Sequence, residues 1–261
     1  MDKVHFGINY LKYNALKTNE HGIHSPFVFD LYNKVLKNNV PFYAYAEMEN
    51  LREQLLSDSR SIEVNDLGAG SGAGLKKSRK ISAIAQTAAK APKYAQLLFR
   101  LVDHFQPATI LELGTSLGMG TMYLAIARSK SRVITMEGCA ETRKIALENF
   151  RKASLQNITS IEGNFDTELP QLLKQEKSLD LVYFDGNHRK EATLDYFEQC
   201  LEKANENSVF IVDDIYWSKG MTEAWETIKA HPEVTVTLDL FQLGIVFFRT
   251  VQAKQHFVLA Y

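Results

Sequence analysis

The chain has 261 residues, of which 45% are hydrophobic and 23% charged, with a formal net charge of −1. This composition excludes a disordered chain and leaves room for one large α/β domain, or for a smaller domain with an extension. The balance of charge gives no overall signal for a polyanionic partner, and the absence of long apolar runs predicts a cytoplasmic protein without membrane contact.

Residues 1–106 are predicted to form a helical N-terminal extension. Ser25 followed by Pro26 is a typical start of a helix. Further helices are expected over residues 45–56, from 81 to a break near Pro92, and from there to about 105. A glycine-rich stretch at residues 66–74 interrupts this pattern and is interpreted as a flexible edge.

A basic segment follows the glycine-rich stretch. No Asp or Glu occurs between Leu67 and Val102, whereas seven basic residues do. These residues are Lys76, Lys77, Arg79, Lys80, Lys90, Lys93 and Arg100. The segment, taken as residues 76–100, forms either a solvated face or a surface for an anionic substrate or nucleic acid.

From Pro107 onward, strand patterns alternate with helical patterns of ten to fifteen residues. Five such strands begin with ATILEL and end with SVFIVDD, and two extended runs then close the chain. This order predicts a Rossmann-like α/β domain over residues 107–261, with a mostly parallel sheet and an antiparallel hairpin at one edge.

The loop that follows ATILEL is the better of two candidate nucleotide sites. A glycine-rich loop binds a nucleotide when it leaves a strand, enters a helix and is followed about 20 residues later by an acid that meets the ribose. Glu137 lies 23 residues after Gly114 and ends the next strand pattern, whereas the stretch at 66–74 has no such acid.

The spacing of this loop also indicates which cofactor it binds. The glycines stand at 114, 118 and 120, which is not the dinucleotide pattern, and Glu112 precedes them. An acid at this place repels a pyrophosphate and suits a cationic ligand. We therefore expect S-adenosylmethionine, which carries an ammonium group and a sulfonium.

Five segments, ILELGTSLGMGT, ITMEG, IEGNFDTELPQLL, LDLVYFDGNH and VFIVDDIYW, resemble the successive motifs of class I S-adenosylmethionine-dependent methyltransferases. The likeness is to the small-molecule O-methyltransferase branch that includes catechol O-methyltransferase, and it spans about residues 107–249. It implies a seven-stranded sheet with an antiparallel last strand. With Glu112, the implied cofactor-binding residues are Gly114, Thr115, Ser116 and Gly118 at the methionine part, Glu137 and Gly138 at the ribose, Asn164 and Phe165 at the adenine, and Asp185 at the mouth.

Carboxylates at the strand ends suggest a further site. Asp185, Asp213 and Asp214 follow two predicted strands and offer the hard oxygen ligands that suit Mg²⁺ or a similar divalent cation. The catechol-type pattern has Asn where this chain has Asp214. His188 stands where those enzymes place a catalytic lysine, and its imidazole can accept a proton from a hydroxyl.

The sequence therefore predicts an S-adenosylmethionine-dependent methyltransferase that acts on the hydroxyl of a small molecule, with Asp185 and His188 as catalytic residues. The N-terminal extension is expected to form a lid and to select the acceptor, and a homodimer is possible. Three different functions stay open: methylation of RNA through the segment 76–100, nucleotide binding without catalysis, and hydride transfer.

Overall fold

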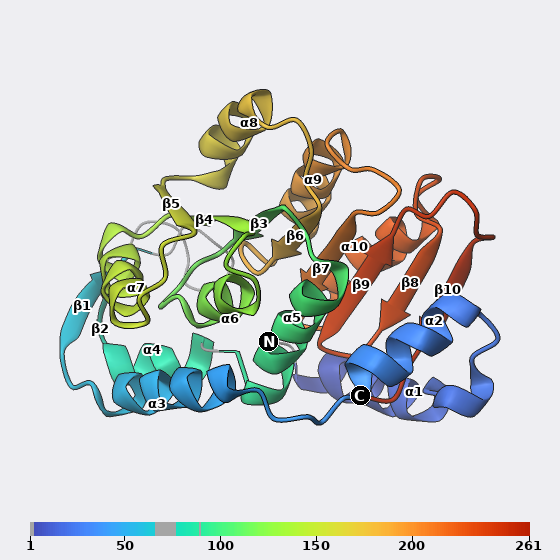
Figure 1. The fold of residues 1–261 in the computed structure, drawn as a ribbon, viewed down its shortest axis with the longest axis horizontal. Helices are drawn as coiled ribbons and strands as arrows, with labels where there is room; N and C mark the ends of the chain where they lie inside the picture. Colours follow the sequence, from blue (N-terminus) through green and yellow to red (C-terminus); the bar gives the residue numbers. More distant parts are fainter. Residues whose placement is uncertain (1–2, 66–76, 89) are drawn as a thin grey trace. The chain divides into compact units, whose positions relative to one another are not determined.

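A computed structural model describes residues 3–65, 77–88 and 90–261 (Figure 1). The stretch 66–74 and Lys76 of the basic segment lie outside the described residues. Contacts divide the chain into two compact units, one formed by Asn39–Leu172 and the other by the residues up to Asn38 together with Leu173–Tyr261. The boundary predicted between residues 106 and 107 does not coincide with this division, and it stays a prediction.

The unit Asn39–Leu172 contains three parallel strands, a hairpin and the helices around them. Its elements are α3 (Tyr43–Ser57), β1 (Ser61–Val64), β2 (Lys77–Lys80), α4 (Ile81–Ala88), α5 (Pro92–Phe105), β3 (Thr109–Leu113), α6 (Met119–Ala127), β4 (Arg132–Glu137), α7 (Ala140–Lys152) and β5 (Ile158–Glu162), and α8 (Phe165–Gln175) crosses its end. Strand β4 pairs in parallel with both β3 and β5, with Leu113 opposite Met136 and Glu137 opposite Glu162. The carboxyl ends of these strands therefore meet at one edge.

Helices of the predicted extension complete the core of this unit. Tyr45 of α3, Phe99 of α5 and Tyr123 of α6 are buried in one apolar cluster. The ring centroids of Tyr45 and Phe99 are 5.2 Å apart, and the Tyr123 hydroxyl donates to Glu49 Oε1 at 2.7 Å. The antiparallel hairpin of β1 and β2 corrects the expectation of a wholly helical extension. Strand β1 has only four residues, and it directly precedes the glycine-rich stretch in the sequence.

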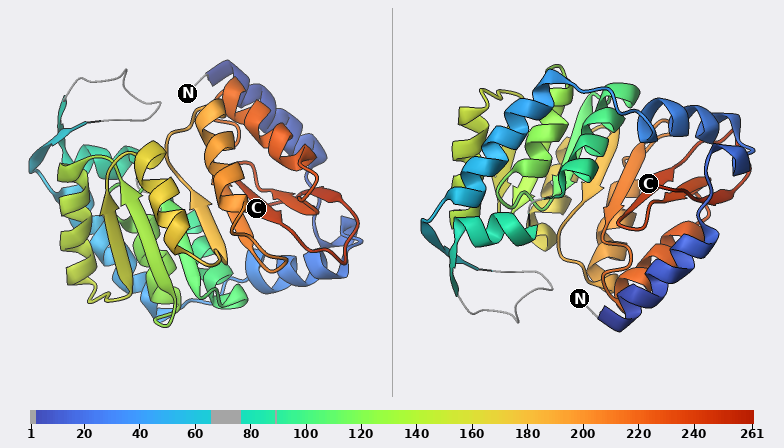
Figure 2. Two further views of the ribbon diagram at one scale, coloured as in Figure 1. Left: turned by 90° about the horizontal axis from the view of Figure 1, so that it is seen from above. Right: turned by 90° about the horizontal axis from the view of Figure 1, so that it is seen from below.

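The second unit joins the N-terminal helices to the C-terminal strands (Figure 2). Its elements are α1 (Lys3–Leu16), η1 (Glu20–Gly22), α2 (Pro26–Leu31), η2 (Tyr32–Leu36), β6 (Leu181–Phe184), α9 (Lys190–Leu201), β7 (Val209–Asp213), α10 (Lys219–Ala230), β8 (Val236–Asp239), β9 (Leu243–Phe247) and β10 (Gln255–Val258). Ser25 caps α2 as predicted, because its hydroxyl accepts from the Val28 amide. The Tyr13 hydroxyl of α1 donates to the Leu259 carbonyl at 2.6 Å, so the two ends of the chain are packed together in this unit.

The predicted terminal hairpin is confirmed, but the sheet has eight strands where seven were expected. Strand β9 runs antiparallel to β7 and to β8. The additional strand, β10, pairs in parallel with β8. Strand β10 has only four residues and lies at the edge of the sheet. Its sequence shows no clear alternation of apolar and polar residues, so the hydrophobic pattern did not predict it.

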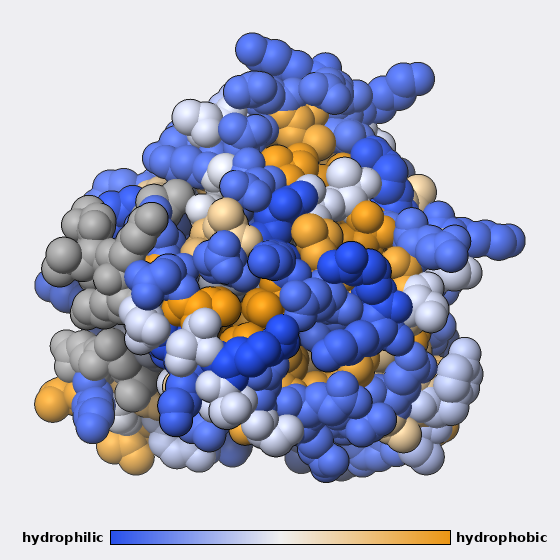
Figure 3. Space-filling model, turned by 90° about the vertical axis from the view of Figure 1, so that its left-hand side faces the viewer, coloured by the Kyte–Doolittle hydropathy of each residue, from blue (hydrophilic) through white to orange (hydrophobic). Residues whose placement is uncertain are grey.

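Within the described residues, no helix combines the length and the apolarity that a membrane crossing requires. The face drawn in Figure 3 is mostly hydrophilic, and its apolar residues gather in small, separate groups.

Candidate active site

The predicted site residues divide between the two units. Glu112 to Phe165 lie in the unit Asn39–Leu172, whereas Asp185, His188, Asp213 and Asp214 lie in the other.

The loop after β3 has a backbone that only particular residues can adopt. Gly114 and Gly118 have φ angles of 108° and 85°, and Ser116 has a φ of 49°. The amides of Gly114 and Thr115 donate to the Met136 carbonyl at 3.0 and 3.1 Å. A Cβ at Gly118 would lie 2.5 Å from Phe150 Cε1, so glycine is required there for both conformation and space.

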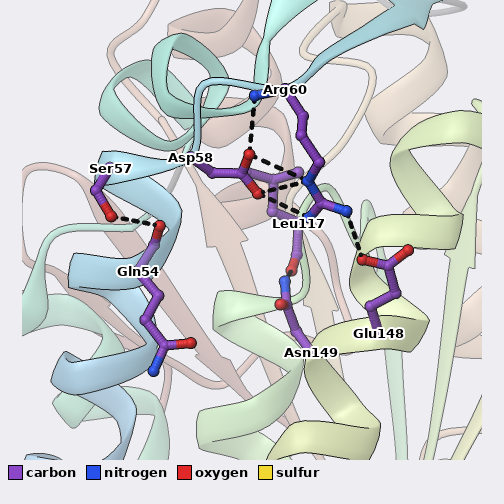
Figure 4. A network of polar contacts seen from close by, with 7 residues as sticks. All are labelled: Gln54, Ser57, Asp58, Arg60, Leu117, Glu148 and Asn149. Atoms are coloured by element: carbon purple, nitrogen blue, oxygen red, sulfur yellow. Dashed lines mark hydrogen bonds and ion pairs between the residues drawn. The ribbon is translucent and has the colours of Figure 1, made fainter.

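A second set of contacts holds the far end of this loop from α7 (Figure 4). Asn149 Nδ2 donates to the Leu117 carbonyl at 2.9 Å, and the Asn149 side chain is buried. On the same helix, Glu148 accepts from Arg60 at 3.1 Å, and Arg60 also pairs with Asp58 at 2.7 Å. Helix α7 thus ties the loop to the segment between α3 and β1.

Glu137, at the end of β4, bridges the loop and the start of α7. Its Oε2 accepts from the Ser116 amide at 2.8 Å, and its Oε1 accepts from the Cys139 amide at 2.9 Å. The two amides hold one carboxylate oxygen each, so the half-buried carboxylate is fixed in orientation at the end of β4.

Glu112 was predicted to face the ligand, but it is buried and exposes only 1% of its surface. Its Oε2 accepts from the hydroxyls of Thr121 and Thr135, the latter at 2.6 Å. Thr135 in turn shares a hydrogen bond of 2.5 Å with Thr115 in the loop. Burial, together with the smaller effect of the charge of Glu137, raises the pKa of Glu112 to about 7, although the hydrogen bonds from the two hydroxyls act to lower it.

The remaining predicted cofactor residues lie at the same edge of this unit. Gly138 follows Glu137 directly. Asn164 is exposed and its Oδ1 accepts from the Asp166 amide at 3.1 Å, so it caps the start of α8. Phe165 is half-buried and is the first residue of that helix.

In the other unit, Asp185 and His188 follow β6. The hydroxyl of Tyr183, which is fully buried, donates to Asp185 Oδ2 at 2.9 Å. The other oxygen of Asp185 lies 4.0 Å from His188 Nε2. This distance is too long for a hydrogen bond, yet the carboxylate stabilises a positive charge on the imidazole.

The three predicted metal ligands stand at the ends of two neighbouring strands. Phe184 lies opposite Val212 in the parallel pair of β6 and β7, so Asp185 and Asp213 end neighbouring strands. Asp214 has a left-handed backbone conformation, with a φ of 53°. Its amide donates to the Gln242 carbonyl at 2.7 Å. Across the ranges that the structure describes, no three His, Cys, Asp or Glu side chains are grouped closely enough to hold a metal ion. The divalent cation site suggested by the sequence stays a prediction.

Several residues that shape the site were not predicted. Thr121, Thr135 and Asn149 hold the loop after β3, and Tyr183 holds Asp185. Thr135 is the only one with a signal in the sequence, because it is a polar residue within the apolar strand RVITM. Thr121 and Asn149 interact with residues that the fold brings near them, and Tyr183 interacts with Asp185, two positions further along the chain.

One of the described basic residues of the segment 76–100 is buried. Arg100 is buried in α5, with 7% of its surface exposed. Arg79 donates to Thr87 on the neighbouring helix at 3.1 Å. A nucleic-acid surface built from the whole segment 76–100 therefore lacks one of the predicted charges.

Glycines turn the loop after β3, and a carboxylate of fixed orientation follows the next strand, β4. Residues 111–215 match a family described as a methyltransferase domain. This match agrees with the resemblance to class I S-adenosylmethionine-dependent methyltransferases seen in the motifs.

The relatives come from the O-methyltransferase branch. A catechol O-methyltransferase of Niastella koreensis is 30% identical over 126 residues, which are 47% of this chain and 55% of that protein. The chain thus matches little more than half the length of this curated relative. An O-methyltransferase of Bacillus cereus in complex with S-adenosylhomocysteine has a TM-score of 0.57 at 18% identity, covering 83% of this chain and 94% of that one. A Podospora anserina methyltransferase bound to the same compound has a TM-score of 0.60 at 14% identity, covering 87% and 97%. These two structures show the shared fold.

Proposed function

We propose that the protein transfers the methyl group of S-adenosylmethionine to a hydroxyl of a small molecule. The observation that carries the proposal is the fixed carboxylate of Glu137 at the end of β4, which accepts from the Ser116 amide of the glycine loop and from the Cys139 amide. The catechol O-methyltransferase relative and the S-adenosylhomocysteine complex of the Bacillus cereus protein support the same cofactor and reaction.

The loop after β3 and the residues around it bind the cofactor in this proposal. Backbone groups of residues 114–118 bind its amino-acid part, Glu137 and Gly138 bind the ribose, and Asn164 with Phe165 flank the adenine. Glu112 acts from behind the loop: its carboxylate fixes Thr135 and through it Thr115, and its charge favours a cation in front of the loop.

Asp185 and His188 act on the acceptor in this proposal. Methyl transfer is an in-line displacement in which S-adenosylmethionine supplies the methyl group, so the protein must align the acceptor oxygen and remove its proton. His188 accepts that proton, and Asp185, held by Tyr183, stabilises the imidazolium that forms. The divalent cation stays a prediction, and no step is assigned to it.

Methylation of RNA, nucleotide binding without catalysis and hydride transfer receive no support from the contacts or from the comparisons. The buried Arg100 weakens the case for RNA, and the fixed carboxylate with the spacing of the glycines argues for an adenosyl compound over a dinucleotide. We retain as proposals a cytoplasmic location and a role of the N-terminal extension in choosing the acceptor.

Calorimetry tests the proposal directly. Titration with S-adenosylmethionine, S-adenosylhomocysteine and NAD is expected to show binding of the first two and none of the third. A panel of small phenols and alcohols, with release of S-adenosylhomocysteine as the readout, then tests catalysis. Tight binding of NAD with no response to the adenosyl compounds would overturn the proposal.

A further inference from the structure

The turn between β8 and β9 contains a residue in an unfavourable backbone conformation. Phe241 has a φ of 71°, which brings the Cβ of an L-residue close to the following carbonyl oxygen and is uncommon for a bulky side chain. Such a conformation persists only where the surrounding structure holds it in place. The Phe241 amide donates to Asp239 Oδ1 at 2.8 Å, and the Phe241 side chain is buried. The contacts around the turn therefore impose its conformation.

Three rings of the N-terminal helix α1 pack against Phe241. The ring centroids of Phe6, Tyr10 and Tyr13 lie 4.9, 5.1 and 5.3 Å from the centroid of Phe241. Ring contacts of this kind stabilise a fold beyond the apolar area that they bury. The Phe241 ring is thus fixed by a helix that is distant from it in the sequence.

The turn in its own right holds the loop after β7. The Asp214 amide donates to the carbonyl of Gln242, the residue after Phe241, at 2.7 Å. The Tyr216 ring stacks on the Phe241 ring with the centroids 5.5 Å apart, and the Tyr216 hydroxyl donates to Asp239 Oδ2. This loop is therefore tied to the turn by a backbone hydrogen bond, a ring contact and a side-chain hydrogen bond.

The loop after β7 lies next to the proposed catalytic residues. Strand β9 runs antiparallel to both β7 and β8, so the carboxyl ends of β7 and β8 lie at the same edge of the sheet. Phe184 lies opposite Val212 in the parallel pair of β6 and β7. The residues that follow β6, among them Asp185 and His188, therefore lie beside the residues that follow β7.

We propose that Phe241 is a positioning residue for methyl transfer, which holds the loop after β7 where this loop aligns the acceptor beside His188. The inference rests on the proposed function. Helix α1 then influences the acceptor through the Phe241 ring. Loss of that ring shifts the loop after β7, whereas residues 114–118 keep the contacts that fix them within the other unit.

Steady-state kinetics of Phe241→Leu test the proposal. With the best acceptor of the phenol and alcohol panel, kcat/KM is expected to fall roughly 10- to 100-fold, because a displacement of about 1 Å can lower a rate by that much. The affinity for S-adenosylhomocysteine should stay unchanged. Phe27→Leu is the matched control, since the Phe27 ring lies 5.0 Å from that of Phe247, which is opposite Val209 at the other edge of the sheet. Equal losses in both variants, or a normal kcat/KM in Phe241→Leu, overturn the proposal.

Hydrogen exchange, followed by mass spectrometry, gives a readout that needs no acceptor. Exchange over residues 214–217 is expected to be faster in Phe241→Leu than in wild type or Phe27→Leu. Tyr216→Phe removes only the hydroxyl bonded to Asp239, so it should give a smaller increase and serves where Phe241→Leu fails to fold. Exchange that neither variant changes overturns this inference alone, even where the wild-type chain methylates an acceptor. A wild-type chain that methylates no acceptor overturns the proposed function and, with it, the role of Phe241.

Discussion

The loop after β3 and the loop after β6 are held in different ways. Residues 114–118 are fixed mainly through backbone groups, which bond to the Met136 carbonyl, the Glu137 carboxylate and the Asn149 side chain. Asp185 is held by the Tyr183 hydroxyl, and His188 stands 4.0 Å from it without a hydrogen bond between them. A loop that presents a fixed backbone suits the binding of a constant cofactor, whereas a carboxylate beside an imidazole suits proton transfer.

Substitution at the loop after β6 should change chemistry and leave folding intact. His188→Ala is expected to lower kcat by roughly 10²- to 10⁴-fold, because a positioned base contributes about that much. The affinity for S-adenosylhomocysteine should stay unchanged, which separates a base from a binding residue. His231→Ala is the matched control, since its side chain is 19% exposed, compared with 23% for His188. Equal turnover in the two variants would contradict the role of His188.

Substitution at the loop after β3 should instead affect folding. Gly118→Ala is expected to lower the free energy of unfolding by about 3 to 4 kcal/mol, because its φ is positive and its Cβ would meet Phe150. Gly220→Ala is the control, since the nearest atom to a Cβ there is Lys190 Cβ at 3.5 Å. Urea unfolding measures both. Adding Phe150→Leu should recover part of the loss, and a Gly118→Ala chain as stable as wild type would show that the loop adapts.

The stability of the folded chain is expected to depend on pH through Glu112, which lies behind the loop after β3. Its pKa of about 7 in the folded chain is above its ordinary value of 4.5, so the folded state holds the proton more tightly. The contribution to stability is complete below pH 4.5 and is lost as the pH rises through about 7, a difference on the order of 3 kcal/mol. Glu112→Gln should not show this loss between about pH 5 and 8. The free energy of unfolding is measured against pH for both proteins. If it changes with pH in the same way in both between about pH 5 and 8, Glu112 does not titrate there.

Glu137 gives the smallest of these effects. Glu137→Ala is expected to weaken binding of S-adenosylhomocysteine by roughly 10- to 100-fold, because it removes hydrogen bonds to a charged acceptor and frees the Ser116 amide. Glu162→Ala is the matched control, since Glu162 lies opposite Glu137 at the end of β5 and is exposed. Calorimetry compares the two. Similar losses in both variants would point to a general effect of charge at this edge.

The sequence predicted the features that depend on local pattern. The alternation of strands and helices after Pro107, the start of α2 at Ser25, the break at Pro92 and the terminal hairpin all follow from periodicity or from the fixed geometry of proline and its neighbours. The loop at 114–118 could also be identified, because glycine spacing and a following acid are local signals.

Tertiary structure alone decided which polar groups are buried and what they contact. Glu112 reads as an acid that faces a ligand, yet packing places it behind the loop and gives it Thr121 and Thr135 as donors. Arg100 reads as part of a basic surface, yet α5 buries it. The first 38 residues belong with the C-terminal strands because contacts such as Tyr13 to Leu259 join residues distant in the chain. Local pattern fixes backbone geometry, but burial depends on which surfaces meet, and only the folded chain determines that.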